Sequence, residues 1–352
     1  MRPTDLRLDR REYLTAGAAG LISLAGMNGV VTGGGSTGYS QEDGGFAPVP
    51  ETAEGPEIPE KGYLVEELGD DLYWITEGTY QMMFLVGDEG VIVVDAPPTI
   101  GQNILNAIDE VTDRSITHVV YSHYHADHIG GASLYPDDAE IIAHERTANT
   151  LSQVSNPDRP APTTTFAGSY VLEVGDQRLE LDFRGANHTQ DNLFIYAPDQ
   201  KVLMFIDVIF PGWVPFKNLA LSQDIPGYIE AHDEVLQYDF ETLVSGHLTR
   251  LGTPEDVRVQ REFIPDLRDN VEEGIETVEL GPIVQDVGNE NPWALFEVYL
   301  NTIVEQATEE TLDKWLGELG AADVFTASHA FVMLEALRVD YGILGPFDLP
   351  EG

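Results

Sequence analysis

The chain has 352 residues, 42% of them hydrophobic, which is enough to bury one sizeable core plus an appendage. Its formal net charge of −43, with 61 Asp and Glu against 18 Lys and Arg, makes nucleic acid and anionic membrane surfaces poor partners. Because the chain has no cysteine, disulfides, thiolate zinc sites and cysteine nucleophiles are excluded, and any metal must be held by His, Asp or Glu.

The acidic residues are spread along the whole chain instead of forming one patch, and lysine occurs at only four positions: Lys61, Lys201, Lys217 and Lys314. An acidic binding surface would concentrate this charge locally. The even spread resembles the surface of proteins from extreme halophiles, where molar salt shortens the Debye length to about 3 Å and screens self-repulsion. We therefore expect a halophilic protein.

The first 60 residues are expected to lie outside the folded domain. Residues 1–32 resemble a twin-arginine export signal, because Arg10 and Arg11 precede a weakly hydrophobic stretch rich in Gly and Ala. The alternative is a membrane anchor, but the glycines and polar residues of this stretch make a poor span. We expect export by the twin-arginine route to an extracellular or cell-surface location, without stable membrane insertion. Residues 33–60, dense in Gly, Pro, Ser and Glu, predict a disordered linker.

Residues 61–253 alternate short apolar runs with a helical pattern, which indicates an α/β architecture. Ile100, Ile104, Ile108 and Val111 recur at helical spacing. The predicted strands are VIVVD (91–95), ITHVVYS (116–122), EIIAH (140–144), YVLEVG (170–175), RLELDF (178–183), NLFIYA (192–197) and KVLMFID (201–207).

Residues 254–352 predict a helical C-terminal extension. Thr253 and Pro254 are suited to the N-cap and first position of a helix, which Pro265 should kink or interrupt. A second apolar stripe follows at helical spacing: Trp293, Phe296, Leu300, Ile303 and Ala307. We expect these helices to pack on the core or on another subunit, the second case giving a homodimer.

The sequence HYHADH, residues 123–128, places four metal-competent side chains after a predicted strand and before Gly130 and Gly131. Neutral imidazoles and carboxylates bind Zn²⁺ at about 2.0–2.2 Å, and a short loop can aim several of them at one point. Three further candidates follow predicted strands in small-residue contexts: His188 in GANHTQDN, Asp207 in LMFIDVIFPG and His247 in LVSGHLTR. Five of the nine histidines therefore fall into one constellation. The other four, His118, His144, His232 and His329, are expected to be structural.

The HxHxDH loop followed by His, Asp and His resembles the metallo-β-lactamase superfamily over residues 61–253. The resemblance implies a four-layer αβ/βα sandwich with the metals at one edge of two packed sheets. It implies that His123, His125 and His188 bind a first metal, that Asp127, His128 and His247 bind a second, and that Asp207 bridges the two. Asp95 matches an acidic residue that supports the site from behind; a simple strand-end cap is the alternative for it.

The resemblance also implies the reaction. Two metal ions per chain, expected to be Zn²⁺ with iron or manganese as alternatives, would share a bridging hydroxide that attacks a substrate carbonyl. Asp127 would orient this nucleophile and relay a proton, which makes it the expected catalytic residue. The predicted enzyme is a hydrolase that cleaves an ester, lactone, thioester or amide bond of a small molecule.

Two positions narrow the range of possible substrates. In many true β-lactamases of this family the position of Asp207 is Cys, and a Lys three residues later binds the drug's carboxylate. Here that later position is Phe210, which disfavours a β-lactam. Tyr80, Trp213 and Phe216 are candidates for an apolar mouth and Lys217 or Asn218 for a polar contact, with ordinary packing or solvation as the alternative for each.

Two other functions stay open at this stage. One branch of the superfamily uses a single iron for sulfur dioxygenation on a similar framework. A non-catalytic metal-bearing binding protein, with its site covered by the helical extension, is the third hypothesis.

Overall fold

The computed structural model describes residues 45–248 and 250–347. The expected twin-arginine segment lies outside these residues. No helix in the described part of the chain is both long and apolar enough to cross a bilayer.

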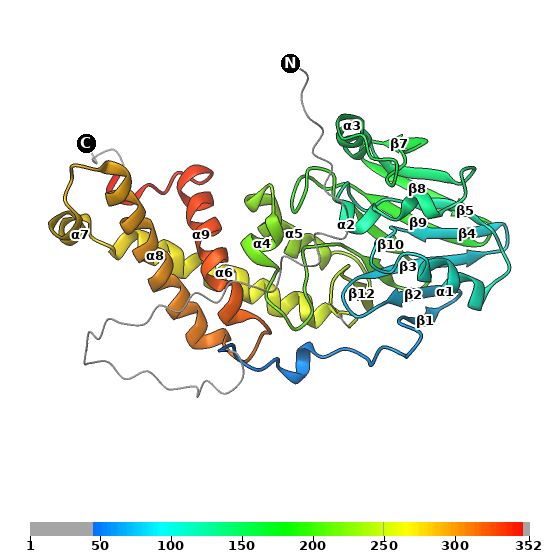
Figure 1. Ribbon diagram of the computed structural model, residues 1–352, viewed down its shortest axis with the longest axis horizontal. Helices are drawn as coiled ribbons and strands as arrows, with labels where there is room; N and C mark the ends of the chain where they lie inside the picture. Colours follow the sequence, from blue (N-terminus) through cyan, green and yellow to red (C-terminus); the bar gives the residue numbers. More distant parts are fainter. Residues whose placement is uncertain (1–44, 249, 348–352) are drawn as a thin grey trace, which may run out of the picture. The chain divides into compact units, whose positions relative to one another are not determined.

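Two mixed β-sheets form the larger part of the fold (Figure 1). In the seven-stranded sheet the first four strands are antiparallel and the last three run parallel to the fourth. Its order is β1 (Leu64–Gly69), β2 (Leu72–Thr76), β3 (Gln81–Gly87), β4 (Gly90–Val94), β5 (Ile116–Val120), β6 (Glu140–His144) and β7 (Thr164–Phe166).

The five-stranded sheet is antiparallel except at one edge, where β12 pairs in parallel with β11. Its order is β12 (Thr242–Val244), β11 (Val202–Met204), β10 (Phe194–Ala197), β9 (Gln177–Asp182) and β8 (Ser169–Val174). The strands predicted from the sequence are confirmed, with ends that differ by a few residues.

Alternation along β10 and β11 shows how this sheet is buried on both faces. Ile195, Val202 and Met204 join the core between the sheets. Phe194 and Leu203, one residue out of phase, join a second core with the helices. Successive strand side chains point to opposite faces, so one strand serves two cores. The expected α/β sandwich with a helical C-terminal region is confirmed.

Helices connect and cover the sheets. Ile104 and Ile108 of α1 (Asn103–Val111) are buried in the hydrophobic core that includes residues of both sheets, as their spacing predicts. The other helices that precede the C-terminal region are α2 (Ala126–Ile129), α3 (Glu145–Gln153), α4 (Lys217–Leu221) and α5 (Ile225–Val235), and the short 3₁₀ turns are η1 (Glu51–Ala53), η2 (Ala132–Leu134) and η3 (Gly345–Phe347).

The C-terminal region consists of α6 (Pro254–Thr277), α7 (Leu280–Val287), α8 (Pro292–Trp315) and α9 (Ala322–Val339). Thr253 caps α6 in a capping box with Asp256, and Pro254 holds the first position, as expected. α6 packs on both α8 and α9, and these helices share a core with the outer face of the five-stranded sheet (Figure 1).

Pro265 was expected to kink or interrupt α6, and the interruption was wrong, because α6 continues through this residue. Pro265 is exposed, so water can satisfy the carbonyl that loses its partner. Its neighbours Ile264 and Leu267 are buried, and their packing keeps the helix continuous.

The described part of the expected disordered linker is not featureless. Ala53 is fully buried, and its carbonyl accepts a hydrogen bond of 3.1 Å from Trp213 Nε1. Arg250 Nε donates to the carbonyl of Thr52 at 2.6 Å. Composition predicted solvation here because the segment has few apolar groups, but one alanine and two backbone carbonyls suffice to anchor it.

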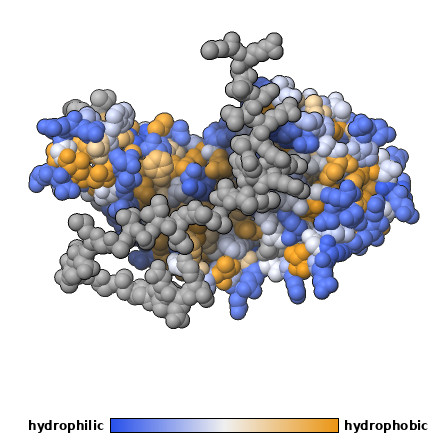
Figure 2. All heavy atoms as spheres, viewed as in Figure 1, coloured by the Kyte–Doolittle hydropathy of each residue, from blue (hydrophilic) through white to orange (hydrophobic). Residues whose placement is uncertain are grey.

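Hydrophilic residues cover much of the visible surface of both the sheet region and the helical region (Figure 2). The apolar residues on this face form small separate groups.

Candidate metal centre

The seven candidate ligands are brought to one edge of the two sheets by loops that follow β5, β9, β11 and β12. His123, His125, Asp127 and His128 lie in the turn after β5 and in α2. His188 lies between β9 and β10, whereas Asp207 and His247 follow β11 and β12 directly. Loops at the ends of neighbouring strands converge, so residues more than 100 positions apart meet here.

Close backbone packing fixes the loop of HYHADH. Gly131 N donates to the carbonyl of Ala96 at 2.8 Å, and a Cβ on Gly131 would lie 2.9 Å from that same oxygen. A Cβ on Gly130 would lie 2.2 Å from the carbonyl of Ala126. Only glycine fits at these positions, which explains why two glycines follow the ligands.

Asp95 supports this loop from behind. Its Oδ1 accepts a 2.8 Å hydrogen bond from Ser122 N, and Ser122 Oγ lies 3.0 Å from His123 Nδ1. Burial raises the pKa of Asp95 to about 6. Asp95 therefore caps the strand end and, through Ser122, also orients a candidate ligand, so both interpretations of this residue apply.

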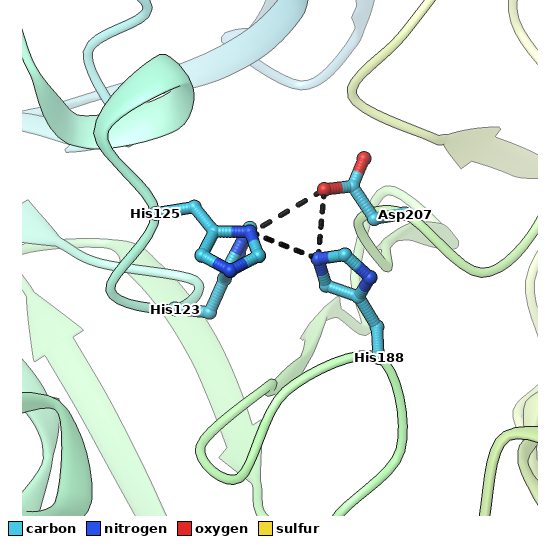
Figure 3. Close-up of side chains that lie close together, drawn as sticks. All are labelled: His123, His125, His188 and Asp207. Carbon is cyan, nitrogen blue, oxygen red and sulfur yellow. Dashed lines mark hydrogen bonds and ion pairs between the residues drawn. The ribbon is translucent and has the colours of Figure 1, made fainter. Parts of the chain in front are cut away.

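The first group consists of His123, His125, His188 and Asp207, whose candidate ligand atoms all lie within 4.8 Å of one another (Figure 3). His188 Nε2 is 3.1 Å from His125 Nδ1 and 3.1 Å from Asp207 Oδ2. His123 Nε2 is 3.7 Å from Asp207 Oδ2. Ligands bound at 2.0–2.2 Å to a tetrahedral Zn²⁺ are about 3.3–3.6 Å apart, so these spacings suit one ion.

The second group consists of Asp127, His128 and His247, whose candidate ligand atoms also lie within 4.8 Å of one another. The Nε2 atoms of His128 and His247 are 3.1 Å apart. Asp127 Oδ2 lies 3.6 Å from the first of these and 3.7 Å from the second. Three donors leave room for a further ligand, as an open catalytic site requires.

Asp207 lies between the two groups. Its Oδ2 is 3.1 Å from both His188 Nε2 and His128 Nε2, and its Oδ1 is 3.0 Å from His247 Nε2. One carboxylate thus contacts imidazoles of both groups. The two His/Asp clusters are consistent with a dinuclear metal site.

Burial and the neighbouring carboxylates shift the pKa values of the cluster in different directions. Burial lowers the pKa of His123 well below its usual range and that of His125 to about 4, so both rings are neutral, as ligands must be. Burial also lowers the pKa of His128, but Asp207 and Asp127 outweigh it and raise the value to about 9. Against the cost of burial, His128 and the other imidazoles hold the pKa of Asp207 well below its usual range.

One candidate ligand atom, His123 Nε2, is buried and has no hydrogen-bond partner within the described chain. An unpaired buried polar atom is costly. A metal ion held by the first group would satisfy this atom.

A cavity of about 380 Å³ opens onto this cluster. Its lining includes Tyr80, Trp213 and Phe216, the three aromatic residues that the sequence suggested for an apolar mouth. Neither Lys217 nor Asn218 is among its lining residues, and Asn218 N instead donates to Ser328 Oγ at 3.1 Å. At these two positions the alternative, ordinary packing or solvation, therefore agrees with the structure.

Several lining residues were missed by the sequence analysis: Phe210 as a wall residue, Val214, Ala220, Leu221, Leu248, Ala321 and Phe325. These residues are ordinary apolar side chains in strand-end loops, in α4 and at or near the start of α9, and no motif marks them. Two of them come from the C-terminal region, more than 70 residues beyond the last candidate ligand.

The four remaining histidines have structural contacts. His144 caps α3, and the pKa of His232 is lowered to about 4 by burial within α5. His118 lies 3.7 Å from Glu140 on the next strand. His329 Nδ1 accepts a 3.0 Å hydrogen bond from Leu219 N.

Residues 75–247 match the family model described as the metallo-beta-lactamase superfamily. These residues belong to that superfamily. The solved metallo-beta-lactamase from Pontibacter korlensis matches 57% of the chain and 97% of its own length with a TM-score of 0.50 and 22% identity. The solved metallo-beta-lactamase IND-7 matches with the same TM-score and 18% identity. These two similarities show the fold.

Curated relatives of this superfamily domain are enzymes. The alpha subunit of 2,4-dinitroanisole O-demethylase from a Nocardioides species is 29% identical over 201 residues, which cover 56% of this chain and 61% of the relative. A metallo-beta-lactamase type 2 from Elizabethkingia meningoseptica is 27% identical over 162 residues, 43% of this chain and 63% of the relative. The chain thus spans less than two thirds of either relative.

Proposed function

We propose that this protein is a dinuclear metal-dependent hydrolase, with zinc as the expected metal, that acts on a neutral, largely apolar small molecule. The bond cleaved is an ester, lactone, thioester or amide. One observation supports this proposal above all: two groups of His and Asp donors lie at one end of a cavity whose other walls are apolar and aromatic.

The side chains have distinct roles in this proposal. Bound metal ions would supply Lewis acidity and lower the pKa of water towards 7. The imidazoles of both groups, Asp207 and Asp127 would hold the ions. Asp127 is the most exposed of these carboxylates, with 43% of its side chain accessible, against 6% for Asp207. Its Oδ2 can accept a proton from an attacking water and return it to the leaving group.

The walls favour an uncharged substrate. None of the described residues that line the cavity is Lys or Arg. Phe210, at the position where many β-lactamases carry a Lys, is one of the lining residues. An anionic substrate would meet two carboxylates in the site and a chain with a net charge of −43, so we disfavour β-lactams.

A second reaction on the same site is hydrolytic cleavage of an aryl methyl ether. It is favoured by the similarity to a 2,4-dinitroanisole O-demethylase subunit. The walls offer aromatic surfaces in Phe210, Trp213 and Phe216, which suit a neutral aromatic ring. Ester cleavage stays the first proposal because an activated ester is cleaved more easily than an aryl methyl ether, which has a poorer leaving group.

The two remaining hypotheses are less favoured. A mononuclear iron oxygenase has no need for the second group of Asp127, His128 and His247. A non-catalytic protein with a covered site is disfavoured because the side chains of Asp127 and His247 are 43% and 21% exposed, so solvent reaches the second group.

Metal content is the first test, measured by mass spectrometry on protein purified in high salt. We expect two metal ions per chain in the wild type, about one in Asp127→Asn and fewer than one in Asp207→Asn, because only Asp207 contacts both groups. Hydrolysis of neutral p-nitrophenyl esters, lactones and nitroanisoles then identifies the bond. One iron per chain with oxygen consumption, or no metal at all, would overturn the proposal.

A further inference from the structure

Two elements outside the ligand loops contribute four of the residues that line the cavity. Ala220 and Leu221 come from the end of α4, Phe325 comes from the first turn of α9, and Ala321 is the N-cap residue of α9. α4 packs against α9. The helical C-terminal region therefore contributes directly to the cavity of the superfamily domain.

α4 is an unusual element. Four consecutive residues, Asn218, Leu219, Ala220 and Leu221, have φ between 50° and 58°, in the left-handed region. None is glycine, and side chains of L-residues are disfavoured there because Cβ approaches the following carbonyl oxygen. A left-handed turn of this length persists only where its surroundings hold it.

Two side chains of α9 hold this turn. Ser328 Oγ accepts a hydrogen bond of 3.1 Å from Asn218 N, and His329 Nδ1 accepts one of 3.0 Å from Leu219 N. Burial lowers the pKa of His329 to about 3, so the ring is neutral and Nδ1 is free to accept. The two donors are successive backbone N–H groups of the turn.

Aromatic packing joins the same two elements at the mouth. The rings of Phe216 and Phe325 meet edge to face with centroids 5.3 Å apart. Phe216 is 51% exposed and Leu221 is 53% exposed, which is unusual for large apolar side chains. Both line the cavity, so this exposed apolar surface continues into the site.

We propose that α9 determines the size of the apolar group that the enzyme accepts. Phe325 and Ala321 form the limiting wall, and Ser328 and His329 position the turn that carries Ala220 and Leu221. This inference rests on the proposed hydrolase function for its kinetic readout. It makes Phe325 a specificity-determining residue and His329 a positioning residue.

Replacing Phe325 tests the wall. In Phe325→Ala, the ratio of kcat/KM for p-nitrophenyl octanoate to that for the acetate should rise about tenfold or more, since a single methylene in a fitted pocket is worth at least about tenfold. Ala321→Phe should lower the same ratio. Metal content should stay at the wild-type value in both variants, because neither residue belongs to the ligand groups.

The matched control is Phe331→Ala. Phe331 lies on the same helix, is 43% exposed and is not among the residues that line the cavity. Its removal should leave the ratio unchanged. An unchanged ratio in Phe325→Ala, or an equal change in Phe331→Ala, would overturn the inference.

Binding separates this inference from the proposed function. Affinities for a series of neutral 4-alkylphenols, measured by calorimetry on the metal-loaded protein, need no turnover. In Phe325→Ala the tightest-binding member should carry a longer alkyl chain than in the wild type. If no ester is cleaved but this shift occurs, the proposed reaction fails and the wall assignment holds. If esters are cleaved without any shift, the wall assignment fails alone.

His329 and Ser328 test the positioning. His329→Ala removes the acceptor for Leu219 N and should raise KM for the octanoate several-fold while the acetate changes little. His329→Asn places an amide oxygen near the position of Nδ1 and should restore the selectivity. Ser328→Ala is the milder variant in case His329→Ala does not fold, with a smaller shift in the same direction. Loss of thermal stability in these variants with unchanged selectivity would show a merely structural role.

Discussion

The ligand edge and the cavity wall formed by α4 and α9 are built in different ways. Four of the seven candidate ligands come from six consecutive residues, and the other three from loops that follow strands of the five-stranded sheet. The wall combines a left-handed turn after Phe216 with a helix that begins at Ala322. The first region depends on short-range backbone geometry, and the second on packing between elements about 100 residues apart.

We expect the ligand edge to determine metal binding and the reaction, and the wall to determine which substrates fit. Substitutions at the ligand edge should remove metal and reaction together, because each imidazole or carboxylate contributes directly to the clusters. Substitutions at the wall and behind it should change stability, substrate size or rate, while the metal stays bound. The following predictions test this division, from the largest expected effect to the smallest.

The largest effect is expected at the ligand edge. His123→Ala or His188→Ala should abolish metal binding and lower kcat/KM by about a thousandfold or more, which corresponds to about 4 kcal/mol of lost transition-state stabilisation. Metal analysis and ester kinetics measure the two effects. His118→Ala, on β5 and outside both groups, is the matched control and should keep its metal. Retained turnover in the His123 variant would contradict the assignment of His123 as a metal ligand.

Stability should respond at the contact between α6 and the cavity loop. Gln260 is buried, and its Nε2 donates to the carbonyls of Phe210 and Trp213 at 2.9 and 2.8 Å. Gln260→Leu should lower the free energy of unfolding by about 1–3 kcal/mol, the cost of leaving a buried carbonyl unpaired. Urea unfolding in high salt measures it. Gln306→Leu, which removes a more exposed hydrogen bond, should change stability by less than about 0.5 kcal/mol.

Acid should destabilise the fold through His329. Burial lowers its pKa from 6.5 to about 3, so between these values the unfolded chain binds a proton that the folded chain does not. This contribution to stability is complete above pH 6.5 and is lost as the pH falls towards 3. Between pH 7 and pH 5, the free energy of unfolding of His329→Asn should therefore fall by about 2 kcal/mol less than that of the wild type. Equal acid sensitivity of the two proteins in urea unfolding would contradict the buried, neutral state.

The smallest effect is expected at Tyr80, which lies between the two regions. Its hydroxyl donates to Asp127 Oδ2 at 3.3 Å, and its ring lies 4.5 Å from that of His247. Tyr80→Phe removes this hydrogen bond but keeps the ring. A net hydrogen bond is worth about 0.5–1.5 kcal/mol, so kcat should fall about 2- to 13-fold with the metal retained. Loss of metal in this variant would contradict the prediction and show that Tyr80 is needed for metal binding.

Most of the sheets and the candidate site could be predicted from the sequence. Alternating apolar runs and the two glycines after HYHADH carry local signals that do not depend on the rest of the chain. The resemblance implied a supporting role for Asp95, but its contact with Ser122 was not predicted, because a hydrogen bond across 27 residues depends on the pairing of β4 with β5. The interruption expected at Pro265 was wrong because the packing of its neighbours outweighed the helix propensity of one residue.

The sequence by itself determined the donor set: with no cysteine and with five histidines and two aspartates in ordered motifs, His and Asp were the available metal ligands. It also determined the class of fold, since strand periodicity is local. Only the tertiary structure decided what surrounds these ligands. Phe325 and His329 carry no motif, and their roles follow from α9 packing against a turn about 110 residues earlier, a contact set by the shape of the whole core.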